Sequence, residues 1–327
     1  MGLDAFFGAV WPAAVRFLHG LARAREDRGE YAKARKLCER AMRILESVPS
    51  SSGRDKLRVR CLSHLGTLDR IEARYDQAEA CLREALAIAS SVFGRRHLET
   101  STLLNNLAVV HKYQGRFLEA KRLYLRSLAI TRASVGPDHV RIATIYHNLG
   151  GLEHARSRYA RGERPARRAV EIRERALGAD HPEVAEDMAA LAAILDGLGR
   201  YGESEPLYRR ALAIFERKLG ATHYEIAVNL NNLAAVCQAT GRAGEAERYY
   251  ERALGIKRAR LGPEHPDVAL TLNNLAALRR AQGRLVEAEA LYRRAASIFE
   301  KALPAEHPSV VTCRANHAAV IREIGKG

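Results

Sequence analysis

The tetrapeptide Asn-Asn-Leu-Ala occurs three times in this chain, and altered copies fill the gaps between the complete ones. The complete and altered copies begin at Asn105, His147, Ala189, Asn231, Asn273 and Ala315, which are spaced 42 residues apart. A fixed interval of this size indicates stacked structural repeats, in which each unit packs only on its neighbours. This interval constrains the fold more than any other feature, because 327 residues would otherwise exceed one ordinary core.

Residues 262–303 show the structure that one interval encodes. The segment 262–266 (Gly-Pro-Glu-His-Pro) ends any preceding helix, since glycine and proline favour turns. Apolar residues then recur at helical spacing up to Gly283, and a second apolar stripe runs from Ala288 to Ile298. Each interval therefore predicts a helix A, a glycine turn and a helix B, without a strand.

Equivalent positions on helix B hold small residues or aromatic rings. Two small columns lie seven residues apart: Ala34, Ala78, Ala120, Gly162, Ser204, Ala246 and Ala288, and Ala41, Ala85, Ser127, Ala169, Ala211, Ala253 and Ala295. The ring columns are Tyr31, Tyr75, Phe117, Tyr159 and Tyr201, and Tyr124, Tyr208, Tyr250 and Tyr292. Rings set against small residues fill a helical interior densely, so these columns predict the core.

The glycine turn and the Ala and Tyr spacing on helix B resemble the tetratricopeptide repeat, and the longer interval with Asn-Asn-Leu-Ala resembles its kinesin light chain type. The resemblance implies an all-α, right-handed superhelical solenoid. Seven full repeats are expected at 13–46, 57–90, 99–132, 141–174, 183–216, 225–258 and 267–300, followed by a half-repeat helix at 309–323. We expect residues 1–12 to form a cap, with Phe6, Phe7 and Trp11 over the first repeat, and residues 13–327 to form the solenoid.

Composition limits the classes of protein to which the chain belongs. The 53 Lys and Arg against 38 Asp and Glu give a net charge of +15, which attracts acidic peptides, nucleic acid or anionic membranes. The five scattered cysteines argue against a disulfide framework or a zinc site and favour a reducing compartment. No run approaches the about 20 apolar residues of a membrane span. The apolar start lacks the basic residues of a signal peptide. We expect a cytoplasmic protein without a membrane partner.

Motifs for catalysis are missing from the sequence. A Gly-rich phosphate loop, Gly-x-Ser-x-Gly and His-Glu-x-x-His do not occur, so we expect no enzymatic activity, cofactor, catalytic residue or metal site.

Two further columns are predicted to be structural. One is a histidine column, which is predicted to make loop or helix-cap hydrogen bonds, since equivalent residues are about 10 Å apart and metal ligands must converge. Its members are His97, His139, His181, His223, His265 and His307. The column Arg74, Arg116, Arg158, Arg200, Arg242 and Arg284 is predicted to bind helix-end carbonyls or a neighbouring acid, with a basic ridge as the alternative.

Polar residues of helix A are the candidate binding residues, because the resemblance implies that helix A lines a concave groove. The candidates for peptide contact are Asn105, Asn106, Lys112, His147, Asn148, Asn231, Asn232, Asn273, Asn274, Arg280 and Asn316. An amide offers two donors and an acceptor, so a line of amides suits the backbone of an extended peptide. Asn side chains that bridge neighbouring repeats are an equal alternative. Lys112 and Arg280 lie in a mainly basic row, which suits an acidic peptide.

Three local departures from the pattern carry predictions. Pro165 lies within helix B of repeat four, which predicts a bend or a late helix start. The pair Ala189-Ala190 interrupts the Asn ladder and predicts an apolar floor for an aromatic or aliphatic anchor. The half-repeat carries Val310, Val311, Ala318, Val320 and Ile321, which look apolar for a terminal cap and predict self-association or a partner domain there.

These observations favour a non-enzymatic scaffold or adaptor that binds a protein or peptide segment in the concave groove, with an acidic peptide as the candidate ligand. Two alternatives stay open: a basic, nucleic-acid-binding helical array, and a regulatory or sensor arm of a larger complex. The aromatic content of 6% argues against nucleic acid, because these rings are assigned to the core and leave no stacking platform.

Overall fold

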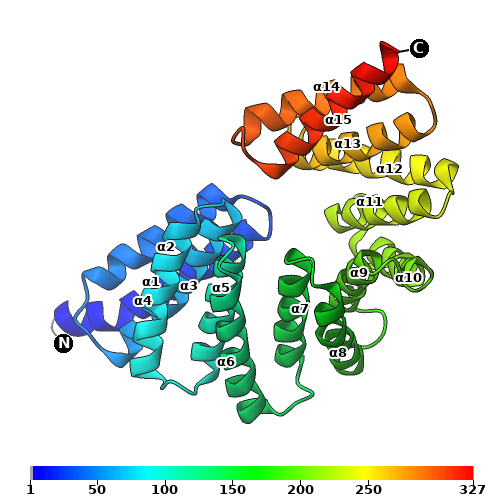
Figure 1. Ribbon diagram of the computed structural model, residues 1–327. Helices are drawn as coiled ribbons and strands as arrows, with labels where there is room; N and C mark the ends of the chain where they lie inside the picture. The colour runs from blue at the N-terminus through cyan, green and yellow to red at the C-terminus, as the bar shows by residue number, and fades with distance from the viewer. Residues whose placement is uncertain (1–2, 327) are drawn as a thin grey trace. The chain divides into compact units, whose positions relative to one another are not determined.

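The computed structural model describes the backbone of residues 3–326 and the side chains from residue 10 onward. Over these residues the chain consists of α-helices joined by short turns, without a strand (Figure 1). Contacts divide the chain into two compact units, Met1–Arg156 and Ser157–Gly327, here called the N-terminal and C-terminal units. The predicted all-α repeat fold is confirmed.

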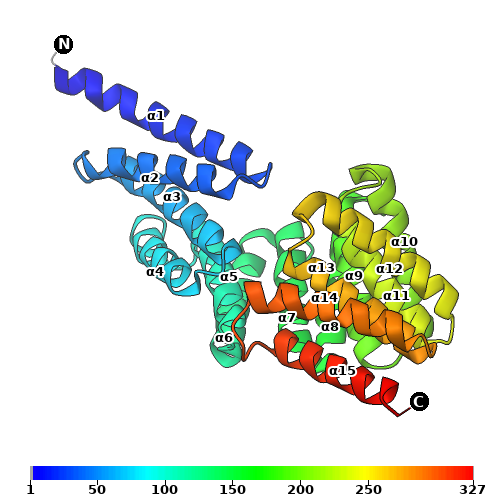
Figure 2. The same ribbon diagram turned by 90° about the horizontal axis from the view of Figure 1, so that it is seen from above.

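The N-terminal unit contains three antiparallel helix pairs and one further helix. Its helices are α1 (Leu3–Glu26), α2 (Tyr31–Glu46), α3 (Ser52–Ile71), α4 (Tyr75–Val92), α5 (Leu98–Tyr113), α6 (Phe117–Val135) and α7 (Val140–Ala155). Helix α1 packs along α2, α3 along α4, and α5 along α6 (Figure 2). Helix A of each repeat also contacts helix A of the next, from α1 to α3, α5 and α7.

The C-terminal unit repeats the same arrangement. Its helices are α8 (Tyr159–Leu177), α9 (Pro182–Gly197), α10 (Tyr201–Leu219), α11 (Tyr224–Ala239), α12 (Ala243–Leu261), α13 (Pro266–Ala281), α14 (Leu285–Ala302) and α15 (Pro308–Ile324). The pairs α9–α10, α11–α12 and α13–α14 pack as whole repeats, and α15 packs on α14 and α13.

The two small columns of helix B are buried throughout, as predicted. Tyr124, Tyr208, Tyr250 and Tyr292 are buried beside them. A side chain no larger than alanine lets two helix axes approach, and the tyrosine rings fill the volume left around the small side chains. The predicted core is confirmed at these columns.

A left-handed residue ends helix A in most repeats. Gly115, Gly199, Gly241 and Gly283 have φ between 72° and 78°, a conformation that glycine adopts without a Cβ clash. The equivalent positions of repeats two and four hold Ala73 at φ 58° and Ser157 at φ 52°. These two side chains keep the turn geometry at a cost in backbone strain.

Histidine caps helix A in six places, which confirms the predicted cap contact. His97, His139, His181, His223, His265 and His307 each accept a hydrogen bond at Nδ1 from the backbone N–H two residues later. Each imidazole therefore satisfies one of the helix-end donors that lack a partner within the helix. Pro182, Pro266 and Pro308 follow directly, at a position where the missing donor matters little.

Two sequence predictions for single helices need correction. Helix α8 begins at Tyr159, like the other helices B, so the late start predicted from Pro165 is wrong. In α15, Val310 and Val320 are buried in the cluster that contains Tyr292 and Phe299, whereas Val311 and Ile321 are exposed. Only part of the predicted apolar face is therefore available to a partner.

The outer face of α15 carries polar residues where the preceding helix A carries leucine. Arg314 and His317 stand in the register of Leu272 and Leu275. Arg314 donates to Glu300 at 2.6 Å, and His317 lies 3.0 Å from Glu289. These ion pairs cover α15 with polar groups in the way that a terminal capping helix requires. Self-association through the half-repeat stays a prediction.

Helix α1 runs without interruption through the predicted boundary at residue 13. Trp11 packs against the cluster of Val15, Leu45 and Leu57. The side chains of Phe6 and Phe7 lie outside the described residues, so the cap over residues 1–12 stays a prediction. In the part of the chain described here, no helix is both long enough and apolar enough to cross a membrane.

We expect Ala73→Gly to stabilise the protein by about 1 kcal/mol, because glycine relieves the strain of a left-handed alanine. Thermal unfolding followed by circular dichroism measures this effect. The matched control is Gly115→Ala, which should lower the midpoint. An unchanged midpoint for Ala73→Gly would contradict strain at this turn.

We expect His265→Ala to destabilise the start of α13 by about 1 kcal/mol, because the first turn loses its side-chain acceptor. His265→Asn should keep most of the stability, since the amide oxygen can also accept this bond. Hydrogen exchange of the first amides of α13 measures the change. Equal exchange rates in the two variants would argue against the capping role.

Candidate functional site

Three neighbouring hollows in the N-terminal unit meet at Asn106 on α5. One is lined by α1, α3 and α5, the second by α3, α4, α5 and α7, and the third by α5, α6 and α7. Their volumes are about 400, 360 and 310 Å³. Because the hollows share Asn106, they form one groove along the helices A of this unit, which we call the Asn106 groove.

The Asn106 groove is rich in cations. Arg70 and Lys112 line the second hollow and Arg141 the third, and neither hollow is lined by an acidic residue. No ion pair of Arg70, Lys112 or Arg141 occurs among the described residues. The first hollow is mixed, because Glu26 and Glu99 line it together with two arginines. The second and third hollows therefore offer positive charge to a ligand.

Burial makes the charged form of Lys112 less favourable. Its Nζ lies 5.0 Å from the centre of the Tyr113 ring, a cation–π contact. Burial lowers the pKa of Lys112, and the nearby charge of Arg70 lowers this pKa further. An anionic ligand placed between the two side chains would offset both effects, because an opposite charge favours the charged form of Lys112.

The predicted Asn residues form a hydrogen-bonded relay across repeats. Asn148 Nδ2 donates to Asn105 Oδ1 at 3.0 Å, and Asn105 Nδ2 lies 3.4 Å from Asn106 Oδ1. Among the described residues the Nδ2 of Asn106 has no acceptor, so its two N–H groups face the shared point of the three hollows. The amides thus join neighbouring repeats and leave the Nδ2 group of Asn106 available to a ligand. Both roles considered for the asparagines, bridging repeats and binding a peptide, are compatible with this arrangement.

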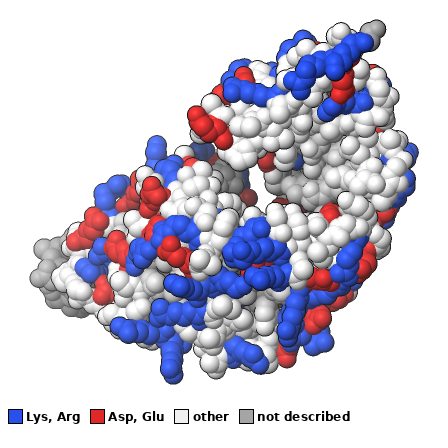
Figure 3. Space-filling view, viewed as in Figure 1, with Lys and Arg blue, Asp and Glu red and all other residues white. Residues whose placement is uncertain are grey.

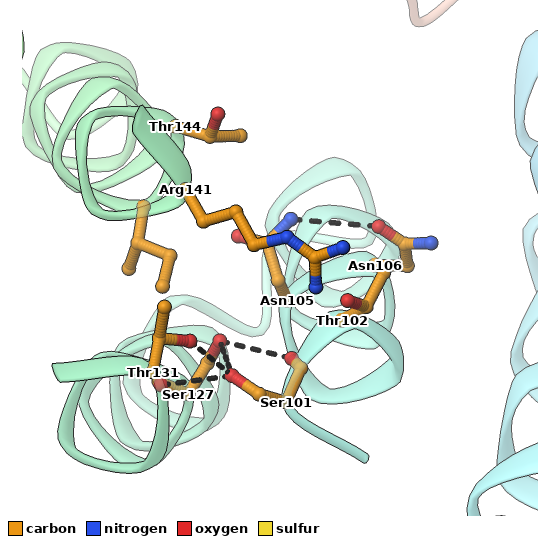
Figure 4. A pocket seen from close by; sticks show the side chains of 9 residues that line it. Ser101, Thr102, Asn105, Asn106, Ser127, Thr131, Arg141 and Thr144 are labelled. Atoms are coloured by element: carbon orange, nitrogen blue, oxygen red, sulfur yellow. Dashed lines mark hydrogen bonds between the residues drawn. The ribbon is translucent and has the colours of Figure 1, made fainter. Parts of the chain in front are cut away.

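A buried cluster of hydroxyl groups forms the floor of the third hollow. Ser101 Oγ lies 2.8 Å from Ser127 Oγ and 2.6 Å from Thr131 Oγ1. Figure 4 shows Arg141 reaching from α7 over this cluster toward Asn105 and Asn106. A polar floor below a free guanidinium suits a polar or negatively charged side chain more than an apolar one.

The C-terminal unit carries a second amide relay. Asn316 Nδ2 donates to Asn273 Oδ1 at 3.4 Å, and Asn274 Nδ2 donates to Asn231 Oδ1 at 3.3 Å. Asn231 is only 8% exposed, which favours a stacking role for it, whereas Asn232 is partly exposed. Arg280 is paired with Glu323, so its charge is already compensated.

The row that contains Lys112 and Arg280 continues through Asp196 and Gln238, which are not basic and which contact tyrosines. Asp196 accepts a hydrogen bond from Tyr208 at 2.9 Å, and Gln238 accepts one from Tyr250 at 3.4 Å. These side chains complete the packing inside single repeats. The unpaired basic character predicted for the row is found in the N-terminal unit, at Arg70 and Lys112.

Five of the six members of the Arg column, all except Arg158, bind neighbouring acids, which confirms the structural role predicted for them. Arg116, Arg200, Arg242 and Arg284 pair with a glutamate of the preceding helix B, which is Glu79, Glu163, Glu205 and Glu247 respectively. Arg74 pairs with Asp69. The four Arg–Glu pairs join the turn of one repeat to the preceding repeat, whereas the Arg74–Asp69 pair lies within repeat two. These paired arginines do not provide a basic ridge for a ligand.

Cys38, His64 and Glu26 lie in the order of a nucleophile, a base and an orienting acid. Cys38 Sγ is 3.3 Å from His64 Nδ1, and His64 Nε2 is 2.8 Å from Glu26 Oε2. However, Cys38 is fully buried, and burial raises the pKa of its thiol to about 12. A nucleophilic thiol needs a lowered pKa and access to solvent, so this triad is a satisfied core network.

Among the side chains described, from residue 10 to residue 326, no group of three or more His, Cys, Asp and Glu is placed to hold a metal ion. The remaining histidine of the predicted site, His147, lines the second hollow beside Asn148. Sequence reasoning found five residues of this groove, namely Asn105, Asn106, Lys112, His147 and Asn148.

Sequence reasoning missed Arg141, Ser101 and Thr131. A signal existed for Ser101, because the equivalent residues in other repeats are Val59, Ala143, Ala185, Ala227 and Ala269. A hydroxyl in an otherwise apolar column marks a local change of function or packing. A signal existed for Arg141 as well, because the equivalent residues in other repeats are Glu99, Glu183, Glu225 and Asp267, so a cation replaces an acid in the first turn of helix A.

We expect Lys112→Met to stabilise the protein by about 1 kcal/mol, because it removes a desolvated charge beside Arg70 and keeps an apolar stem of similar length. The midpoint of thermal unfolding measures the gain. Lys36→Met on α2 is the control for loss of a lysine elsewhere and should change the midpoint little. A lower midpoint for Lys112→Met would contradict the cost assigned to this charge.

Sequence comparison identifies the repeats. The tetratricopeptide repeat profile matches residues 57–133, 102–164, 141–217, 192–259, 225–301 and 267–326, and a second tetratricopeptide repeat profile matches residues 18–50. No curated protein matches the chain significantly.

Solved structures similar to this chain include kinesin light chain-like proteins. BtubC (BKLC) from P. vanneervenii is 25% identical over 70% of this chain and 91% of its own, with a TM-score of 0.57. A putative kinesin light chain from Podosopora anserina, with nearly identical TPR-like repeats, is 24% identical over 63% of this chain and 97% of its own, with a TM-score of 0.53.

A third similar structure is the Rap conjugation gene regulator of the plasmid pLS20 in complex with the Phr* peptide. It is 17% identical over 88% of this chain and 74% of its own, with a TM-score of 0.66. At this identity the likeness concerns the fold alone. The repeat profiles together cover most of the sequence, and their helices, turns and packing columns are those found in the structure. The chain therefore belongs to the tetratricopeptide repeat family, with repeats of the kinesin light chain type.

Proposed function

We propose that this protein is a scaffold that binds an extended, acidic peptide segment in the Asn106 groove. The observation that carries the proposal is the open donor of Asn106 between hollows lined by Arg70, Lys112 and Arg141, without an acidic residue in the second and third hollows. Amides bind the peptide backbone whatever its sequence, and unpaired cations select negatively charged side chains.

The fold supports this proposal. Helix A of successive repeats brings polar side chains to one surface at regular intervals, which matches the regular spacing of groups along an extended peptide. The Rap regulator of pLS20, which shares the fold, was solved in complex with a peptide. Affinity would come from several contacts together, because each solvent-exposed ion pair contributes little alone.

The net charge of +15 motivates nucleic acid as the competing ligand. On the face shown in Figure 3, Lys and Arg are scattered among uncharged residues and Asp or Glu over both units. Many of these arginines are already paired with glutamate, which reduces the charge available to phosphates. The unpaired cations that line the groove are few, which favours a short acidic peptide.

The proposal is tested with a fluorescein-labelled peptide of alternating Glu and Gly, titrated with the full chain. We expect Asn106→Leu with Lys112→Met to weaken binding about tenfold, because one amide and one charge are lost. Gln77→Leu, an exposed amide on α4, is the matched control and should bind like the unchanged protein. Fluorescence anisotropy measures each dissociation constant.

Equal affinity of the double variant and the unchanged protein would refute the groove assignment. Tighter binding of mixed-sequence single-stranded DNA than of the peptide, with a steep dependence on salt, would favour the nucleic-acid alternative. Circular dichroism of both variants shows whether the fold is kept.

A further inference from the structure

Helix α6 differs on its outer face from four of the other helices B. In α4, α8, α10 and α14 this face carries a Glu and an Arg four residues apart, and the pairs Glu79–Arg83, Glu163–Arg167, Glu205–Arg209 and Glu289–Arg293 lie at 2.7, 2.8, 2.7 and 3.3 Å. The equivalent residues of α6 are Lys121 and Leu125. Lys121 pairs with Glu153 on α7, and Leu125 replaces the arginine by an apolar side chain.

A second row of ion pairs is also missing from α6. In the C-terminal unit Arg210 binds Glu174 at 2.6 Å and Arg252 binds Glu216 at 2.7 Å, which joins neighbouring helices B. Arg126 of α6 has Ser90 at the corresponding position, and Arg132 stands in the register of Glu174. Arg126 therefore lacks an acidic partner on α4, and α6 itself carries the cation Arg132 where α8 carries an acid.

Three arginines of α6 are consequently unpaired. Arg122, Arg126 and Arg132 are exposed, and among the described residues none of them makes an ion pair. The one acid of this helix, Glu119, is already bound to Arg116. In Figure 3, Lys and Arg gather with few Asp or Glu over the lower part of the N-terminal unit, where α6 lies.

The exposed residues of α6 have the spacing of a helix-packing seam. Leu118 and Leu125 are 67% and 48% exposed, and they lie about 10 Å apart along the helix axis. Exposed residues follow at alternating steps of four and three, the 3.5-residue average of helices that pack along one another. The seam consists of Leu118, Arg122, Leu125, Ala129 and Arg132.

We propose that this α6 seam is a second docking surface, separate from the Asn106 groove, and that its partner is an amphipathic helix of another protein. The partner helix would place apolar side chains against Leu118 and Leu125 and Asp or Glu beside Arg122, Arg126 and Arg132. Charge complementarity specifies acids, because the seam holds cations and no acid. The seam spacing specifies a helix.

An anionic membrane is the other surface that would take arginine and leucine. The seam fits a bilayer less well, because its large apolar residues are only the two leucines, one after the other along the helix, and it carries no exposed aromatic ring. Helices that lie in a membrane interface need a broad apolar face to compensate for insertion. The narrow seam therefore favours a helix over a bilayer.

The probe for this surface is a fluorescein-labelled, lactam-stapled helix about three heptads long, with Leu at its seam positions and Glu beside them. We expect it to bind the full chain in fluorescence anisotropy, more weakly as salt rises. Leu118→Ser with Leu125→Ser should weaken binding about tenfold, because two apolar contacts are lost. Val286→Ser is the matched control, since Val286 occupies the register of Leu118 on α14 and is 74% exposed.

Charge reversal gives a second, independent readout. Arg122→Glu with Arg126→Glu should abolish binding of the Glu probe and create binding of the same helix with Lys in place of Glu. Arg28→Glu with Arg258→Glu, at exposed positions away from α6, makes the same change in net charge and should leave the Glu probe bound.

The proposal is overturned if the Glu probe does not bind the unchanged chain, or if a scrambled peptide of equal composition binds as tightly. Equal binding by the Leu118 and Leu125 double variant has the same consequence. Binding of phosphatidylserine vesicles that is lost in the same variants, without binding of the probe, would assign the seam to membranes instead. Because these substitutions are on an exposed face, the helical circular dichroism should not change, and a change would be followed by the charge-swap experiment, which keeps both leucines.

Discussion

Close packing between helices with small side chains is the interaction on which the rest of this structure depends. The alanine columns of helix B, from Ala34 to Ala288 and from Ala41 to Ala295, are buried, and large rings such as Tyr124 and Tyr208 occupy the space around them. A larger side chain in these columns would separate the helices and expose the apolar surface that holds neighbours together. Because every repeat packs in this way, equivalent polar residues of helix A lie on one surface of the stack, and those of helix B lie on another.

Polar interactions between repeats add specificity to this packing and decide which groups remain for a partner. The arginine after the turn is bound to a glutamate of the preceding repeat in four repeats, as Arg242 is bound to Glu205. Where such an acid is missing, a cation is left without compensation, as at Arg141 in the groove and at Arg126 on α6. The α6 surface thus arises from an interruption of repeated ion pairs, whereas the groove arises from cations that line hollows without an acidic residue.

The amide relay shows that a stacking residue and a binding residue need not be different. Asn148 donates a hydrogen bond to Asn105, and Asn105 lies beside the oxygen of Asn106. The N–H groups of Asn106, at the end of the relay, are not used by these contacts. An amide has more hydrogen-bonding capacity than one neighbour can use. A substitution in the relay therefore affects both stability and ligand binding, so that exposed amides outside the groove, such as Gln77, are the appropriate controls.

Much of the fold was predictable from the sequence, because helical periodicity, glycine turns and small residues are local signals that repeat. The candidate site was predictable only in part. The rows of asparagine were visible, but the sequence does not state that Asn231 is buried, that Arg280 is bound to Glu323, or that Arg141 reaches over Ser101. Each of these depends on contacts between residues that are far apart in the chain or on the direction of a long side chain.

The sequence by itself determined the repeat, the pairing of helices A and B, the buried columns and the capping histidines, since each follows from backbone geometry and the period of apolar residues. The tertiary structure alone decided which polar residues still have free bonding capacity. An ion pair forms only where folding brings the two charges within a few ångströms. Arg116 is therefore paired with Glu79, whereas Arg70 and Lys112 line a hollow without an acidic residue. It also decided that Val310 and Val320 face the core, because helix docking, and not composition, sets which side of α15 is covered.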